Sequence, residues 1–266
     1  MKFLACDLDG TLVETEKNFI RKDNIEAIKK LRNKGHKFII STGRDIKGIK
    51  SILNDNNGIE FDYLVLCNGA LILDNTFNQI YKNTLPHHVV KSVYDNIYKA
   101  NTDNDAAMYV TYEDTSSVFY TGCNEEFKDF LGAFENVNNE SEVFSEKREY
   151  NLISVFSKSS NCEIAETFKE KLVENFGDSY GIFRNQAFVD MVGNDCSKGS
   201  GLKKIIEIEN WDINNLYTIG DSYNDISMFE ITDNSFTFNH VEDGVKAKAN
   251  HTVDFVHQCI DIILNS

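Results

Sequence analysis

The chain has 266 residues, 41% of them apolar and 26% charged, with a formal net charge of −15 at neutral pH. This composition is typical of a folded globular protein, and the length allows one large domain or two modest ones. The negative charge argues against nucleic acid or an anionic membrane as a partner, since both are polyanions. With no apolar run near about 18 residues and no N-terminal apolar region of the signal-peptide kind, we expect neither a membrane span nor secretion. Six cysteines without a C-x-x-C pair predict free thiols in a reducing cytoplasm.

The first predicted strand covers residues 3–6 and ends abruptly at two carboxylates one residue apart, Asp7 and Asp9. In open parallel sheets, ligands bind outside the carboxyl ends of the strands, so these acids are placed where chemistry takes place. Two carboxylates this close repel each other, and a bound divalent cation is the simplest way to neutralise them. An ordinary acidic turn would give the same residues, so this motif is not decisive by itself.

A second strand-and-turn unit follows a helix predicted at 23–35. The strand 37–40 ends in Ser41-Thr42-Gly43-Arg44, and a helix begins near Asp45. A hydroxyl, a glycine amide and a helix N-terminus together make a good anion site. A routine strand-to-helix turn explains the same residues, so this motif also needs support from elsewhere.

The stretch 63–70 is a third strand-and-turn unit. Its turn contains Asn68 and Gly69, which an ordinary turn explains as well as a functional site does. The alternation of strands and helices up to this point is typical of a parallel sheet with crossover helices. The segments 71–73 and 79–81 are expected to form a hairpin.

The pattern changes near residue 84, beside the only proline, Pro86. A mixed segment follows, with strands expected at 107–112, 117–121, 152–156, 180–184 and 188–192 and helices at 89–97, 125–134 and 163–176. Because the parallel pattern resumes afterwards, we expect an inserted α+β cap domain at 84–187. The core, at 1–83 and 188–266, is then an α/β domain with a Rossmann-like parallel sheet and helices on both faces.

Two polar clusters follow the cap. Lys198 opens a predicted helix, where its charge is unfavourable unless an anion lies between it and the helix amides; a solvated surface lysine is the alternative. The strand 216–219 ends at Asp221, and Asn224 and Asp225 lie within one helical turn of it. An acidic helix cap would explain these residues as well. A strand at 234–239 and a helix at 253–263 complete the chain.

The carboxyl ends of parallel strands meet at one edge of a sheet, so these distant polar residues can share one pocket. Oxygen ligands without histidine or cysteine predict a hard cation such as Mg²⁺. Carboxylates that hold a cation beside a lysine, a threonine hydroxyl and free amides suit a phosphoryl group. The sequence therefore predicts a phosphate-handling metal site in an acidic protein.

Four segments resemble, in order, the four motifs of the haloacid dehalogenase superfamily. They are Asp7-Leu8-Asp9-Gly10-Thr11, Ser41-Thr42-Gly43-Arg44, Lys198-Gly199 and Gly220-Asp221-Ser222-Tyr223-Asn224-Asp225. The resemblance is closest to the Cof-type phosphatases of subclass IIB, which carry a large α/β cap between the second and third motifs. It implies a phosphatase that passes through an aspartyl-phosphate.

The resemblance also implies a role for each motif residue. Asp7 would be the nucleophile, and Asp9 would act as general acid and then general base. Mg²⁺ would be bound by the carboxylates of Asp7 and Asp221 and the backbone carbonyl of Asp9, with Asp225 in support. The phosphoryl oxygens would be held by the Leu8 amide together with Thr42, Gly43, Lys198 and Asn224.

The expected substrate is a small phosphorylated metabolite. A sugar phosphate comes first, and a cofactor such as pyridoxal phosphate or FMN comes next. Candidate specificity residues are Arg44 in the core and Phe183, Arg184 and Asn185 in the cap. We expect a monomer or a small homo-oligomer.

Two alternatives stay open. A phosphosugar mutase would use the same four motifs, and a phosphate-binding or phospho-switch module would be phosphorylated on Asp7 without turnover. The presence of Asp9 argues against the second alternative, since it supplies the acid and base that hydrolysis needs. It also argues against a dehalogenase, which lacks the second acid and the metal.

Overall fold

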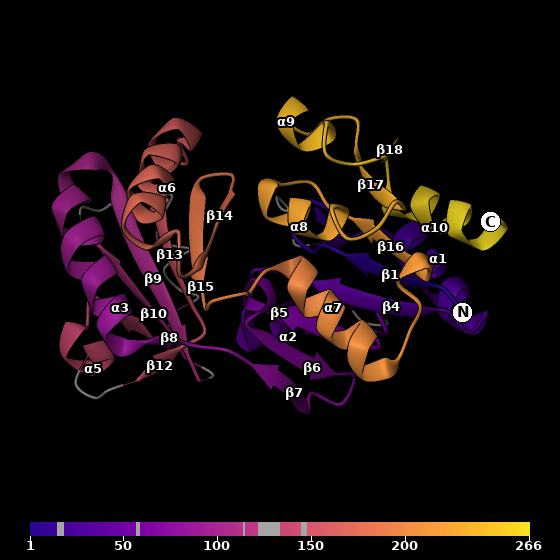
Figure 1. Ribbon diagram of the computed structural model, residues 1–266, viewed down its shortest axis with the longest axis horizontal. Coiled ribbons are helices and arrows are strands. Elements are labelled where there is room, and N and C mark those ends of the chain that lie inside the picture. Colours follow the sequence, from indigo (N-terminus) through magenta and orange to yellow (C-terminus); the bar gives the residue numbers. More distant parts are fainter. Residues whose placement is uncertain (15–18, 57–58, 114, 122–133, 145–147) are drawn as a thin grey trace. The chain divides into compact units, whose positions relative to one another are not determined.

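The computed structural model describes residues 1–266 except 15–18, 57–58, 114, 122–133 and 145–147 (Figure 1). Contacts divide the chain into two compact units. The first joins Met1–Lys82 to Ser197–Ser266, and the second is the intervening segment Asn83–Cys196. One unit is therefore inserted into the other, as the change of pattern near residue 84 predicts.

The first unit is built on a sheet in the order β18-β17-β16-β1-β4-β5-β6-β7. Neighbours from β18 to β5 are parallel, and β6 and β7 form the expected antiparallel hairpin at one edge. The strands are β1 (Phe3–Cys6), β4 (Lys37–Ser41), β5 (Tyr63–Leu66), β6 (Leu71–Asp74), β7 (Gln79–Lys82), β16 (Leu216–Ile219), β17 (Ser235–Phe238) and β18 (His251–Val253), with a separate pair β2 (Val13–Glu14) and β3 (Phe19–Ile20).

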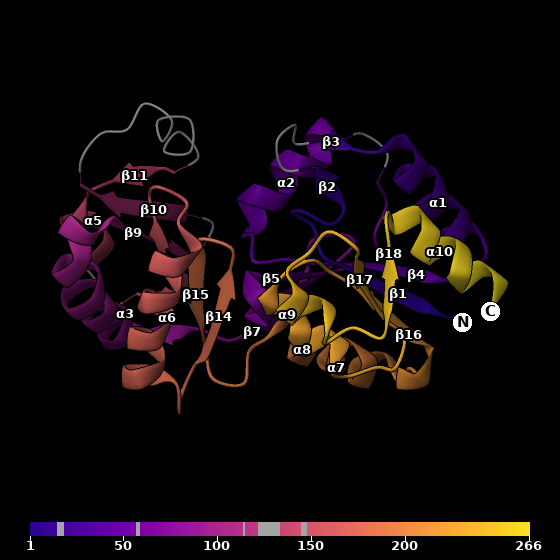
Figure 2. The ribbon, with the colours of Figure 1, turned by 90° about the horizontal axis from the view of Figure 1, so that it is seen from above.

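Helices cover both faces of this sheet, with α7 and α8 on one side and α1 and α10 on the other (Figure 2). The strand β1 is completely buried, which explains its uninterrupted apolar sequence. Its Phe3 and Ala5 pack with Leu202 and Ile205 of α7. The helices are α1 (Lys22–Asn33), α2 (Ile46–Asp55), α7 (Lys198–Glu209), α8 (Ile226–Phe229), α9 (Asp243–Lys246) and α10 (Val256–Asn265). The prediction of a Rossmann-like α/β core is confirmed.

The second unit is an α+β domain with a mainly antiparallel sheet in the order β11-β10-β9-β13-β15-β14. Alternate residues of β9, such as Met108 and Val110, pack with Val90 of α3 and Phe168 of α6 in one apolar cluster. The elements are α3 (His87–Val93), β9 (Ala106–Tyr112), β10 (Thr115–Tyr120), β11 (Asn136–Val137), α5 (Glu140–Phe144), β13 (Leu152–Ser157), α6 (Cys162–Phe176), β14 (Gly181–Asn185) and β15 (Phe188–Val192), with β8 (Leu85–Pro86) paired to β12 (Glu149–Tyr150).

The end of the inserted unit differs from the expected boundary at residue 187. The strand β15 pairs with β13 and β14 in the second sheet, although the sequence placed residues from 188 onward in the core. The reason is local, because β14 and β15 form a hairpin in which Asn185 pairs with Phe188 and Gln186 has a φ of 51°. The helix expected at 125–134 lies almost entirely outside the described residues. Among the described helices, none is long and apolar enough to cross a membrane.

Candidate active site

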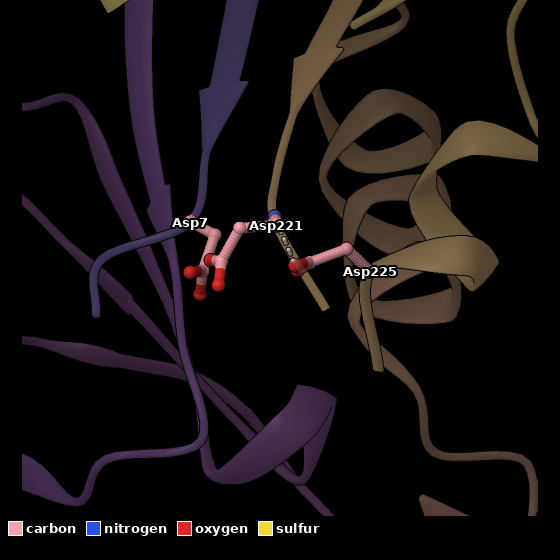
Figure 3. Close-up of side chains that lie close together, drawn as sticks. All are labelled: Asp7, Asp221 and Asp225. Atoms are coloured by element: carbon pink, nitrogen blue, oxygen red, sulfur yellow. Dashed lines mark hydrogen bonds between the residues drawn. The ribbon is translucent and has the colours of Figure 1, made fainter. Parts of the chain in front are cut away.

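Strand register brings the first and fourth motifs together. The strands β1 and β16 are parallel neighbours with Cys6 opposite Ile219, so the residues that follow them leave the sheet at the same edge. The backbone N–H of Asp7 donates to the Ile219 carbonyl at 2.9 Å, which continues the ladder by one residue. Asp7 and Asp221 consequently lie side by side, and Asp225 approaches from the turn after β16 (Figure 3).

The three carboxylates form a compact acidic cluster. One oxygen from each of Asp7, Asp221 and Asp225 lies within 4.8 Å of the other two. Asp225 is completely buried, and its Oδ2 accepts hydrogen bonds from the backbone N–H groups of Asp221 and Ser222 at 2.9 and 3.0 Å. The Thr11 hydroxyl donates to Asp221 Oδ1 at 2.7 Å. Hydrogen bonds within the chain therefore hold the carboxylates of Asp221 and Asp225 in place.

Gly10 allows this arrangement. Its φ is +81°, and a Cβ at this position would lie only 2.5 Å from Asp221 Oδ2. Any other residue would therefore be strained in its backbone and would collide with the Asp221 carboxylate. The glycine of the first motif thus makes room for the acid of the fourth.

Lys198 bridges two of the acids. Its Nζ lies 2.5 Å from Asp7 Oδ1 and 2.7 Å from Asp225 Oδ1, and the side chain is 1% exposed. The alternative of a solvated surface lysine is therefore wrong. Burial lowers the pKa of Lys198, but the charges of Asp225 and Asp7 outweigh burial and hold it above its ordinary value. The lysine stays charged inside the cluster.

The negative charge of the cluster exceeds what one lysine can neutralise. Burial raises the pKa of Asp7 well above its ordinary value, and the charge of Asp225 raises it further against the opposing effect of Lys198. Burial, followed by Asp225, also raises the pKa of Asp221 to about 6, although the Thr11 hydroxyl opposes this rise. Three converging carboxylates, of which Asp7 and Asp221 have raised pKa values, fit a small hard cation that would offset their negative charge.

Asp9 lies outside the acidic cluster and has a cationic partner of its own. Arg44 Nε donates to Asp9 Oδ2 at 2.8 Å, and Arg44 Nη2 donates to Asp9 Oδ1 at 2.7 Å. The Asp9 side chain keeps 26% of its surface exposed. The loop of the second motif orients the arginine, because the Arg44 backbone N–H donates to the Thr42 hydroxyl at 3.1 Å. The first and second motifs are thus joined by a two-pronged ion pair.

The N-terminus of α7, which carries Lys198, is locked in place by small residues. A Cβ on Gly199 would lie 1.9 Å from the Ser227 carbonyl oxygen, and a Cβ on Gly69 would lie 2.0 Å from the Ser197 carbonyl oxygen. The Gly199 N–H also donates to the Ser227 hydroxyl at 3.1 Å. Ser197 caps the helix by accepting from the Ser200 N–H. The start of α7 therefore packs so closely against α8 and against the turn at Gly69 that only glycine fits at the two contacts.

A comparison with known protein families covers the motif residues described above. The sequence model of the haloacid dehalogenase-like hydrolases matches residues 4–260. The chain belongs to this family. The match spans both units, so the inserted unit is part of the family likeness, and the prediction of a hydrolase of the phosphatase type is confirmed at this level.

Individual relatives cover almost the whole chain. A protein of Mycoplasma capricolum, described as uncharacterized, is 26% identical over 95% of this chain and 97% of its own. The 5-amino-6-(5-phospho-D-ribitylamino)uracil phosphatase YwtE of Bacillus subtilis is 24% identical over 94% of this chain and 91% of its own. The solved structure of BT4131, a sugar phosphatase of haloacid dehalogenase subclass IIB, superposes with a TM-score of 0.80 at 25% identity and covers 98% of both chains.

The predicted phosphate-binding residues Leu8, Thr42 and Gly43 lie in the turns of the first two motifs of this haloacid dehalogenase-like hydrolase. Thr42 is buried, and its backbone N–H donates to the Val65 carbonyl at 2.8 Å. Its hydroxyl oxygen accepts from the Arg44 N–H, which leaves the hydroxyl O–H to donate to a ligand. Gly43 follows in the same loop. The Leu8 carbonyl accepts from the N–H groups of Leu12 and Val13, which closes the turn that contains Asp9.

The cap candidates lie together on β14 of the inserted unit. Arg184 is buried there, and its Nε lies 2.8 Å from Glu166 Oε2 on α6 while Nη1 donates to the Gln186 carbonyl at 3.0 Å. These contacts tie the strand to the helix. Phe183 and Asn185 are half-buried on either side of Arg184 in the sequence.

Two residues were given no role by the sequence analysis. Thr11 belongs to the first motif and hydrogen-bonds Asp221, and Asn68 Oδ1 accepts from Nδ2 of Asn224 at 3.2 Å. In the sequence, the one feature that marked Asn68 was its position at the end of a predicted strand, and this position is equally typical of an ordinary turn. Its partner lies 156 positions away, so no local pattern could indicate the contact.

Proposed function

We propose that this protein is a Mg²⁺-dependent phosphatase that hydrolyses a small phosphorylated metabolite through an aspartyl-phosphate on Asp7. The observation that carries the proposal is the buried Lys198, which contacts Asp7 and Asp225 inside a cluster of three carboxylates. A nucleophilic carboxylate beside a fixed cation and an oxygen-ligand site is suited to phosphoryl transfer.

The metal would be held by Asp7 and Asp221, with Asp225 in support and the Asp9 carbonyl as a further ligand. When bound, it supplies positive charge that balances the carboxylates and the phosphoryl oxygens. The raised pKa values of Asp7 and Asp221 support this assignment, because both express the cost of burying these carboxylates and of placing them beside Asp225.

In the first step, Asp7 attacks phosphorus, a new bond forms between its oxygen and phosphorus, and the bond to the leaving oxygen breaks. Asp9 gives its proton to that oxygen, so the product leaves as an alcohol. Lys198, the Thr42 hydroxyl, Asn224 and the amides of Leu8 and Gly43 would hold the phosphoryl oxygens during this transfer.

In the second step, Asp9 takes a proton from a water molecule, whose oxygen attacks the phosphorus of the aspartyl-phosphate. The bond from phosphorus to Asp7 breaks, and inorganic phosphate and the free carboxylate are restored. Asp9 is then protonated again, ready for the next substrate. Both steps balance without any redox partner.

We propose a sugar phosphate, or another phosphate ester of a polyhydroxylated carbon chain, as the substrate class. The likeness to a sugar phosphatase at 25% identity and to a phosphatase whose named substrate carries a phosphorylated ribityl chain supports this choice. Pyridoxal phosphate and FMN are the next candidates. The cytoplasmic location and the monomeric or small homo-oligomeric state stay predictions from the sequence.

The test is release of inorganic phosphate from sugar phosphates, pyridoxal phosphate, FMN and p-nitrophenyl phosphate. We expect release that needs Mg²⁺, stops with chelator and is abolished by Asp7→Asn. Asp243→Asn is the matched control, since this carboxylate is fully exposed in α9 and should leave the rate unchanged.

Other outcomes would replace the proposal. Isomerised sugar phosphate without net phosphate release would indicate the mutase. A stable phosphorylated Asp7 without turnover would indicate the phospho-switch module. Release that persists with Asp7→Asn would exclude Asp7 as the nucleophile.

A further inference from the structure

The turn after β5 has an unusual backbone. Cys67, Asn68 and Gly69 all have positive φ, with values of 49°, 48° and 93°. This conformation is unfavourable for residues other than glycine and persists only where the surroundings enforce it. Two non-glycine residues with positive φ, followed by a glycine, indicate a turn whose shape is enforced by its surroundings.

This turn is anchored to the second motif and to the start of α7. The Asn68 N–H donates to the Thr42 carbonyl at 3.1 Å, and the Cys67 N–H donates to the Arg44 carbonyl at 3.0 Å. On its other side, Gly69 lies against the Ser197 carbonyl, directly before Lys198. The turn therefore contacts two of the loops to which we assign phosphate binding.

Asn68 also contacts the fourth motif through its side chain. Both Asn68 and Asn224 are at least 99% buried, and Asn224 Nδ2 donates to Asn68 Oδ1 at 3.2 Å. The other end of the same carboxamide, Asn224 Oδ1, has no hydrogen-bond partner among the described residues. A buried acceptor without a donor costs about 1–3 kcal/mol, so this orientation is unfavourable for Asn224.

This contact leaves Asn224 with a donor for an anion. A carboxamide nitrogen carries two N–H donors, and Asn68 Oδ1 accepts one of them. The second N–H can donate to a phosphoryl oxygen, which accepts hydrogen bonds. Asn68 thereby holds the Asn224 carboxamide in this orientation, although Asn224 Oδ1 has no partner among the described residues.

We propose that Asn68 is a positioning residue that orients the Asn224 carboxamide so that its N–H group faces the bound phosphoryl group. The proposal rests on the proposed function, because it requires an anion at this site. Asn68 acts through Asn224 and touches no reacting atom. Its contribution is to substrate and product binding rather than to the chemical step.

The test uses Asn68→Gly, Asn224→Ala and the double variant. Glycine adopts positive φ without strain, so Asn68→Gly removes the side chain while the turn keeps its backbone. Asn210→Gly is the matched control, because Asn210 is exposed at the end of α7 with a φ of 52°. Each protein is measured for p-nitrophenyl phosphate hydrolysis with Mg²⁺ and, by calorimetry, for binding of inorganic phosphate.

We expect Asn68→Gly to raise KM and the phosphate dissociation constant about tenfold, with kcat within about threefold, because one binding interaction is lost equally in the ground and transition states. In the Asn224→Ala background, Asn68→Gly should have no further effect, since the two residues act as one unit. Asn210→Gly should leave all three quantities unchanged.

Unchanged KM and phosphate affinity in Asn68→Gly, with active wild-type protein, would overturn the positioning role and leave the phosphatase proposal intact. Additive effects of the two substitutions would also overturn it, because they would show that Asn68 acts on the fold and not through Asn224. A wild-type protein that releases no phosphate from any ester would refute the proposed function, while calorimetry would still test the amide pair. Absence of both hydrolysis and phosphate binding in the wild-type protein would overturn both proposals.

Discussion

Arg44 holds the carboxylate of Asp9 with two hydrogen bonds, of 2.8 Å from Nε and 2.7 Å from Nη2. The guanidinium thereby fixes both oxygens of the residue to which we assign proton transfer. This contact turns Arg44 from a candidate specificity residue into a candidate for positioning the general acid. Lysine cannot reproduce a two-pronged contact, because its ammonium is a single point of charge.

Arg44→Lys should lower kcat on the order of tenfold and change KM much less, because Asp9 would lose its orientation during proton transfer. Steady-state kinetics with p-nitrophenyl phosphate measures both. Arg32→Lys is the matched control, since Arg32 also holds both oxygens of an aspartate, Asp62, at 3.1 and 3.3 Å. The control should leave kcat unchanged. A raised KM with constant kcat in Arg44→Lys would instead support a contact with the substrate.

Mg²⁺ should raise the thermal midpoint of chelator-treated protein. A free Mg²⁺ concentration of about one hundred times the dissociation constant stabilises the folded protein by about 2.7 kcal/mol. The raised pKa values of Asp7 and Asp221 mean that the folded metal-free protein binds more protons than the unfolded chain. Its stability should therefore fall as the pH rises from about 3.9, the ordinary aspartate value, through about 6, the value for Asp221.

The Mg²⁺-induced shift should consequently be larger at pH 8 than at pH 5, where protons compete with the metal. Differential scanning calorimetry with and without Mg²⁺ at both pH values measures this. Asp221→Asn should stabilise the metal-free protein and reduce its response to Mg²⁺. An equal shift in Asp221→Asn and wild-type protein would show that the metal binds elsewhere.

Lys198→Met should abolish hydrolysis and destabilise the protein by about 3–5 kcal/mol, because it leaves Asp7 and Asp225 buried without their cation. Urea unfolding of the metal-free proteins measures the loss. The double variant Lys198→Met/Asp225→Asn should recover part of the stability and none of the activity. No recovery would mean that lost packing of the lysine stem, rather than unpaired charge, causes the destabilisation.

Asp62 provides a pH-dependent contribution to stability away from the acidic cluster. Burial raises its pKa, but hydrogen bonds from Arg32, the Phe38 N–H and Lys37 outweigh burial and hold the pKa below its ordinary value. A lowered folded-state pKa stabilises the protein above the unfolded value of about 3.9, and this contribution is lost as the pH falls through the folded value. Asp62→Asn should therefore lower the thermal midpoint at pH 7, and the deficit should shrink below pH 4.

Asp243→Asn, at a fully exposed carboxylate, is the control for that comparison and should show no deficit at either pH. A deficit of equal size at pH 7 and pH 3 would contradict the prediction. It would then reflect the altered shape of the hydrogen-bonding group and not its ionisation.

Gly199→Ala tests whether close packing sets the position of Lys198. The added Cβ would lie 1.9 Å from the Ser227 carbonyl, so the start of α7 must move. We expect a lower thermal midpoint and a kcat/KM reduced on the order of a hundredfold, since small displacements of a binding group cost about this much. Gly35→Ala serves as the contrasting variant. An added Cβ at Gly35 would meet no atom within 4 Å, but the φ of +80° is unfavourable for alanine, so this substitution should lower stability and leave activity unchanged. Unchanged activity in Gly199→Ala would show that Lys198 tolerates the shift.

Local sequence patterns determined much of this protein. Apolar runs that end in polar residues predicted the strands β1, β4, β5 and β16, because a buried strand must end where charge begins. The ordered motifs indicated that their polar residues meet, since parallel strands end at one edge of the sheet. The carboxylates of Asp7, Asp221 and Asp225 do converge.

The tertiary structure alone decided which side chains are partners. Lys198 contacts Asp7 across 191 positions, and Arg44, which the sequence offered only as a candidate for specificity, holds Asp9. The sequence also could not predict that Asn68 pairs with Asn224 or that β15 belongs to the second sheet. The physical reason is that periodicity reports which face of an element is buried. Packing between elements then determines which charged and polar groups must satisfy one another away from water.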